Sequence, residues 1–109
     1  MRERTRHCLE DMLESARRAL LYRDEAPESW RQQDLRVDAI LRRVGVVGEA
    51  ASRVPAADRE QFPGIEWRVI IGMRQHIVHG YDSIDLDILD TVLRDDLPTL
   101  VRQLETLLS

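Results

Sequence analysis

The chain has few of the residues that mark membrane, secreted or disulfide-rich proteins. Its single cysteine, Cys8, cannot form an intrachain disulfide, so a reducing cytoplasm is the simplest setting. No apolar run approaches the ~20 residues that a bilayer span needs. The opening MRERTRHCLE also lacks the apolar stretch of a secretory signal. We therefore expect a cytoplasmic protein with no membrane partner.

Lysine is absent, so all 16 basic residues other than histidine are arginines. The net charge of −4 argues against a general nucleic-acid binder. The charge is also uneven: residues 1–80 hold 14 Arg against 13 acidic residues, and residues 81–109 hold 2 Arg against 7. Any contact with RNA must therefore be local. The acidic end either repels nucleic acid or docks a basic partner.

Apolar residues recur at spacings of three and four along most of the chain, which predicts amphipathic helices. Asp34 is the expected N-cap of the second helix, Asp85 or a neighbour starts the fourth, and Pro98 lies in the first turn of the last. No segment alternates at period two, so no sheet is expected. The predicted helices cover residues of about 4–25, 35–54, 64–81, 85–95 and 97–108.

This pattern places the chain in the all-α class. A chain of 109 residues allows one core, and we expect a single domain over residues 1–109, built as a four- to five-helix up-and-down bundle. Leu35 is counted among the inward residues of the second helix, and Cys8 is read as a buried small hydrophobe. Gly45 and Gly48 lower the helix propensity of the second helix, and they either permit close packing or mark a kink.

The segment RQHIVHGY, residues 74–81, is the most informative for function. At ~100° per residue, Arg74 and Tyr81 fall on the apolar arc of the predicted helix, whereas His76 and His79 fall on its polar side. A charge on an apolar face is costly unless it is paired or faces a wet cleft. His79 lies ~140° around the helix from Arg74. Two copies across a twofold axis could bring both groups to one cleft, so a homodimer is expected.

These residue types suit the cleavage of a phosphodiester. The forked donors of arginine fit phosphate, and histidine moves protons near neutral pH. Arg74 and His79 are therefore the candidate catalytic residues. No cofactor or metal is expected, because no pair among His7, Cys8, His76 and His79 has a recognisable zinc spacing.

Each of these side chains also has a structural interpretation. Arg74 could pair with an acid such as Glu66 or Asp82. His79 could be a surface histidine near a helix C-terminus, where a cation is favoured. Tyr81 could be a packing residue with a hydrated hydroxyl.

Three stretches carry a resemblance to a known family: WRVIIGMR at 67–74, HGY at 79–81 and DLP at 96–98. Together they resemble the HepT-like toxins of the HEPN superfamily, with motif detail over roughly residues 60–108. The resemblance implies a bundle that dimerises around the motif helix. It also implies a metal-independent RNA endonuclease, the toxin of a type VII-like toxin–antitoxin pair.

The same resemblance implies a nucleotidyltransferase antitoxin that adds AMP to the motif tyrosine, here Tyr81. Gln75 departs from the Asn, Asp or His that often follows the arginine in the superfamily. Gln75 can still donate and accept hydrogen bonds, so Gln75 and His76 are expected to support the site.

Two other functions are compatible with the sequence. One is a non-catalytic helical partner of a nucleotidyltransferase, for which Arg74 and His79 would be dispensable. The other is a nucleotide-binding helical module, which predicts ATP binding by the isolated chain. The acidic balance favours these two functions, whereas the intact R-x-x-x-x-H-x-Y motif favours the nuclease.

Overall fold

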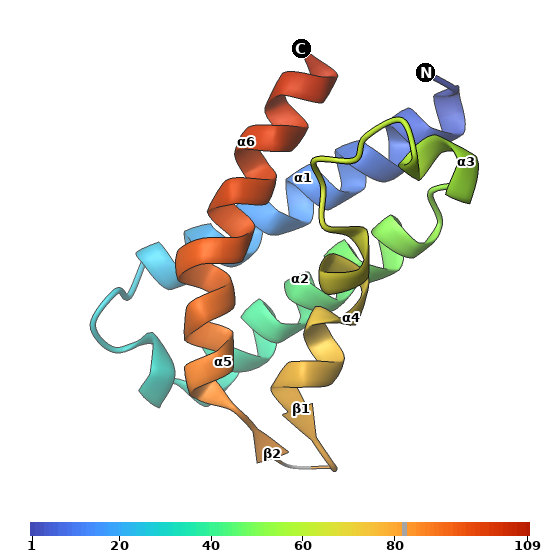
Figure 1. Ribbon diagram of the computed structural model, residues 1–109. Helices are drawn as coiled ribbons and strands as arrows, with labels where there is room; N and C mark the ends of the chain where they lie inside the picture. The colour runs from blue at the N-terminus through green and yellow to red at the C-terminus, as the bar shows by residue number, and fades with distance from the viewer. Residues whose placement is uncertain (82) are drawn as a thin grey trace.

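Helices α1 and α2 run in opposite directions side by side and form the base on which the other helices pack (Figure 1). The computed structural model describes residues 1–81 and 83–109 of the chain. Helix α1 spans Glu3–Asp24 and α2 spans Asp34–Ser52. The short helix η1, Trp30–Gln32, lies in the connection between them. Trp30 is buried there, so this connection is anchored to the core.

Two further long helices cross this pair. Helix α4, Trp67–Ile77, packs on α2, and α6, Leu97–Leu108, packs on α1 (Figure 1). Between them the chain forms α5, Leu86–Thr91, and the π-helix η2, Val92–Asp96. The all-α helical bundle predicted from the sequence is therefore confirmed. In the part of the chain that the structure describes, no helix combines the length and hydropathy that a membrane crossing needs.

The core lies where the four long helices meet. Its fully buried large side chains share the helical spacing that predicted the bundle. Leu35 is an exception to that prediction, because it is 87% exposed at the start of α2. The buried large side chains include Leu9, Met12, Ile40, Val44, Ile77, Leu89, Leu93, Leu100 and Leu104.

Gly48 sets the close approach of α2 and α4. A Cβ built on Gly48 would lie 3.2 Å from the carbonyl oxygens of both Ile70 and Ile71. Only a residue without a side chain lets the α4 backbone come this near. Of the two interpretations left open by the sequence, close packing is the one that Gly48 fulfils.

The end of α4 departs from the predicted helix. The helix stops at Ile77 instead of continuing to Tyr81, and the chain turns into a small antiparallel hairpin of β1, Val78–His79, and β2, Ser83–Ile84. The expectation of no sheet was therefore wrong. The turn includes Gly80, whose φ of +73° suits a residue without a Cβ. The Asp85 amide donates to the Ile77 carbonyl at 2.7 Å and ties the hairpin to the helix end.

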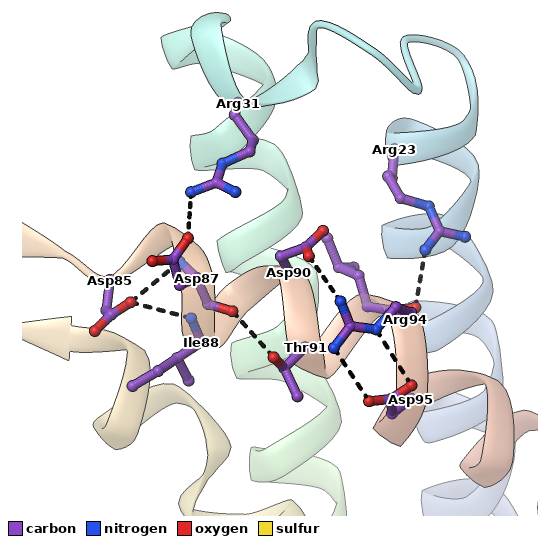
Figure 2. Close-up of polar contacts among 10 residues, drawn as sticks. Arg23, Arg31, Asp85, Asp87, Ile88, Asp90, Thr91, Arg94 and Asp95 are labelled. Carbon is purple, nitrogen blue, oxygen red and sulfur yellow. Dashed lines mark hydrogen bonds and ion pairs between the residues drawn. The ribbon is translucent and has the colours of Figure 1, made fainter.

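Smaller differences concern helix ends and loops. Asp34 is the first residue of α2 and not its N-cap, which is Gln33 without a side-chain cap. The segment between the second and third predicted helices contains a single helical turn, α3, Ala56–Arg59. The fourth helix was expected to start at Asp85 or a neighbour. It starts at Leu86, and Asp85 is its N-cap, since the Asp85 side chain accepts hydrogen bonds from the amides of Asp87 and Ile88 (Figure 2). Pro98 lies in the first turn of α6, also as predicted.

The π-helix η2 is hydrogen-bonded to α1. Arg23, near the end of α1, donates to the Leu93 carbonyl at 2.9 Å (Figure 2). Arg94 lies between the carboxylates of Asp90 and Asp95, at 3.3 and 3.5 Å. Part of the acidic charge of the C-terminal region is thus neutralised within the chain.

A buried carboxylate joins α1 to α3. Asp58 accepts two hydrogen bonds from the Arg2 guanidinium, at 3.2 and 2.8 Å, and a third from the Thr5 hydroxyl. These donors lower the pKa of Asp58 below its ordinary value, against the opposing effect of burial. The start of α1 is therefore fixed by an ionised aspartate.

Candidate functional site

The residues of the R-x-x-x-x-H-x-Y motif lie on three different local structures at one end of the molecule. Arg74 is in the last turn of α4, His79 is in β1, and Tyr81 is in the hairpin turn. The hairpin extends beyond the end of α4 (Figure 1). The predicted angle of ~140° between Arg74 and His79 assumed a continuous helix, so it does not describe the folded chain.

Arg74 is exposed, although its helical phase placed it on the apolar arc. Its side chain lies over α2 at Gly45. A Cβ built on Gly45 would be 3.1 Å from Arg74 Cδ and 3.6 Å from Nε. The missing side chain of Gly45 therefore provides the space through which the arginine stem reaches solvent. Like Gly48, Gly45 permits close packing.

The side chain of Arg74 has no hydrogen bond or ion pair to any residue that the structure describes. The predicted structural pairing with Glu66 is therefore not formed. The other suggested partner, Asp82, lies outside the described residues. The guanidinium thus has no bonding partner among residues 1–81 and 83–109.

The groove beside Arg74 has a volume of about 390 Å³. Its floor comes from one face of α2, where residues 38, 42, 45 and 49 follow at spacings of four, three and four. Sequence reasoning missed this face, although its charged residues do recur at helical spacing. The groove is lined by Asp38, Leu41, Arg42, Gly45, Val46, Glu49 and Arg74.

The remaining motif residues are also exposed. His79 and Tyr81 both face solvent, and Tyr81 is 104% exposed, so its predicted place on an apolar arc was wrong. His76 is exposed, and its ring lies 3.9 Å from the position of a Cβ on Gly72. Gln75 is exposed beside it. The described residues that line the Arg74 groove do not include His79.

A second groove, of about 520 Å³, lies between the start of α4 and the junction of η2 with α6. Glu66, Asp95 and Asp96 line it. Burial, together with the nearby carboxylates of Asp95 and Glu66, raises the pKa of Asp96. A phosphate would be repelled there, which leaves the Arg74 groove as the better anion site.

The candidate metal ligands of the sequence are dispersed. Cys8 is buried in α1, as predicted, whereas His7 faces solvent, with ring nitrogens 3.7 and 3.5 Å from the carboxylates of Glu3 and Glu10. Within the described ranges, no three His, Cys, Asp or Glu side chains gather where they could hold a metal ion.

Comparison with known proteins identifies a family whose sequence pattern the chain matches. Residues 12–107 match the family described as "Ribonuclease HepT-like". A Methanocaldococcus jannaschii protein named "Putative RNase MJ1380" is 30% identical over 67 residues, which cover 62% of each chain. The Thermococcus cleftensis "Probable ribonuclease HepT" is 30% identical over 69 residues, 63% of each chain.

A longer relative matches nearly the whole chain. The M. jannaschii "Gamma-glutamylcyclotransferase and putative RNase MJ0434" is 28% identical over 105 residues, which cover 95% of this chain and 47% of the relative. The chain thus spans about half to three fifths of the length of these curated relatives. No solved structure gives a significant match.

Proposed function

Because the chain belongs to the HepT-like ribonuclease family, we propose that it is a metal-independent endoribonuclease with Arg74 and His79 as its catalytic residues. The observation that carries the proposal is the placement of Arg74. A guanidinium held over Gly45 and open to solvent is positioned to bind an anion.

RNA supplies its own nucleophile, the ribose 2′-hydroxyl. His79 removes the proton from this hydroxyl, or donates a proton to the leaving 5′-oxygen, a role typically worth ~10²–10⁴-fold in rate. The 2′-oxygen bonds to phosphorus and the bond from phosphorus to the 5′-oxygen breaks. Arg74 stabilises the charge that develops on the non-bridging oxygens. The products are a 2′,3′-cyclic phosphate and a 5′-hydroxyl.

A homodimer would complete this site. His79 lies on the hairpin and does not line the groove at Arg74. One reaction needs both a proton donor and a proton acceptor, so the histidines of two chains could share these roles. We therefore propose that two copies associate around α4, with an arginine and a histidine from each.

The cellular role follows from the family resemblance. We propose a cytoplasmic toxin of a type VII-like toxin–antitoxin pair, inhibited by a nucleotidyltransferase antitoxin through addition of AMP to Tyr81. The exposed side chain of Tyr81 supports this, because a modifying enzyme needs access to the hydroxyl. The added phosphate would bring negative charge to the motif and repel the RNA backbone.

The test compares purified wild-type chain with Arg74→Ala and His79→Ala on single-stranded RNA in the presence of a chelator. Each substitution should reduce cleavage by about 10²-fold or more. Arg68→Ala is the matched control, because Arg68 is exposed on the same helix and lies outside the groove. An RNA with 2′-deoxyribose at every position should not be cut. Parental cleavage by either site variant would refute the assignment.

Modification is tested by mass spectrometry of the chain after co-expression with its antitoxin. The mass of one AMP on Tyr81 is expected, and Tyr81→Phe should lose it. An unmodified chain in an inhibited complex would show that inhibition comes from contact alone.

A non-catalytic partner module of a nucleotidyltransferase is the second candidate function. The separation of His79 from the Arg74 groove favours it, as does the acidic charge balance. Folded wild-type chain that neither cuts RNA nor arrests growth would support this alternative over the nuclease.

A further inference from the structure

The face of α2 beneath Arg74 carries a second uncommitted guanidinium. Arg42 lines the same groove as Arg74 and is exposed. Asp38 precedes it by four residues, the spacing at which helical ion pairs form. The guanidinium of Arg42 nevertheless forms no ion pair or hydrogen bond with any of the described residues.

The two arginines are brought together by Gly45. Arg74 crosses α2 at this glycine, and Arg42 lies three residues before it on the same face. Residues three apart on a helix have Cβ atoms ~5–6 Å from each other. Arg42 therefore begins about one helical turn from the point where Arg74 emerges, and both side chains can reach a single stretch of backbone.

The acidic residues at the two ends of the groove limit the length of RNA backbone that it can bind. Asp38 and Glu49 line it on either side of the arginines, and their carboxylates repel phosphate. The eleven-residue step between them spans roughly 16 Å of helix, from 1.5 Å per residue. The groove is therefore too short to follow the backbone of a long RNA duplex. Its length suits one or two phosphates of a single strand.

We propose that Arg42 is a second phosphate-binding residue, which holds the RNA backbone at the phosphate next to the one that Arg74 binds. This inference rests on the proposed ribonuclease function and adds a residue outside the R-x-x-x-x-H-x-Y motif. Arg42 binds the ground state and the transition state alike, since its phosphate does not react. It therefore affects substrate binding more than the chemical step.

The test uses the full chain and a labelled single-stranded 2′-deoxy oligonucleotide that cannot be cleaved, with affinity measured by fluorescence anisotropy at several salt concentrations. Loss of one single-strand phosphate contact lowers the slope of log affinity against log salt by ~0.7. Between 50 and 200 mM salt, wild type should therefore lose about 2.6-fold more affinity than Arg42→Gln. Arg42→Lys should keep the wild-type slope, because a point charge still binds phosphate.

Arg53→Gln is the matched control. Arg53 is also exposed, as the C-cap residue of α2, but it does not line the groove, so the slope for Arg53→Gln should equal that of wild type. In cleavage assays with all-ribose RNA, Arg42→Gln should raise KM and leave kcat unchanged, whereas Arg74→Gln should lower kcat.

The outcomes separate the inference from the proposed function. If wild type cleaves RNA and Arg42→Gln has the same salt slope and KM as wild type, the role of Arg42 is refuted and the proposed nuclease function is not. If binding of the oligonucleotide depends on Arg42 but wild type does not cleave RNA, phosphate binding by the groove is supported and the nuclease function is refuted. Wild type that does not bind the oligonucleotide at low salt would overturn the inference itself.

Discussion

Replacing Gly48 by alanine tests the packing that positions α4. The added methyl would lie 3.2 Å from two carbonyl oxygens of α4, closer than ordinary van der Waals contact. Overpacking of this kind costs ~1–3 kcal/mol. Alanine recovers ~1 kcal/mol through its higher helix propensity. Because the contacted atoms belong to a helix backbone and cannot rotate away, the overpacking cost should lie in the upper part of this range, about 2–3 kcal/mol. The net loss is then about 1–2 kcal/mol, or roughly 4–8 °C in Tm.

Gly72→Ala is the control for this experiment, because it makes the same chemical change in α4 without the clash. Among the described residues, its methyl would meet only the His76 ring, at 3.9 Å. Helix propensity then dominates, and stability should rise by ~0.5–1 kcal/mol. Urea and thermal unfolding followed by circular dichroism measure both variants. A Gly48→Ala chain as stable as Gly72→Ala would refute the close approach of α2 and α4.

Two further predictions concern stability. The lowered pKa of Asp58 means that its stabilising contribution is present above the unfolded aspartate value near pH 4 and is lost as pH falls through the folded pKa. Urea midpoints should therefore favour wild type over Asp58→Asn at neutral pH, with the difference shrinking below about pH 4; a constant difference across this range would contradict the ionised Asp58. Leu104→Ala should cost ~2–5 kcal/mol, because Leu104 is fully buried, whereas Leu35→Ala should stay within ~0.5 kcal/mol. Equal unfolding midpoints for these two leucine variants would refute the placement of the core.

The sequence predicted the helices because their burial follows a single period. Leu9, Ile40 and Leu104 lie at inward positions of regular amphipathic segments, and the structure buries all three. Asp85 and Pro98 were predictable for a local reason, since capping and first-turn geometry depend on near neighbours.

The end of α4 was not predictable in the same way. Helical spacing continues through Tyr81, so the periodicity carries no signal that the helix stops at Ile77. The stop depends on pairing of Val78 with Ile84 and on the Asp85 amide, six and seven residues further along the chain. Two-residue strands are also too short to show alternation.

The sequence left open whether Arg74 is paired or faces solvent, because the helical wheel treats a helix as though its neighbours were uniform. A side chain on the inward arc is buried only where the opposing surface carries side chains. At Gly45 the opposing surface has none, so Arg74 passes over α2 and remains hydrated. The clue lay about thirty residues upstream, in another helix, and only the tertiary fold connects the two positions.

This arrangement divides the proposed site into two parts with different supports. Arg74 and Arg42 are held by the α2–α4 contact, which depends on Gly45 and Gly48 in the packed bundle. His79 and Tyr81 belong to the hairpin, which is joined to the bundle through β1 and the Asp85–Ile77 hydrogen bond. Anion binding and proton transfer would therefore depend on separate elements of the structure. A modification of Tyr81 would change the charge of the hairpin and leave the arginine groove intact. A modified chain should therefore lose RNA cleavage and keep its free energy of unfolding.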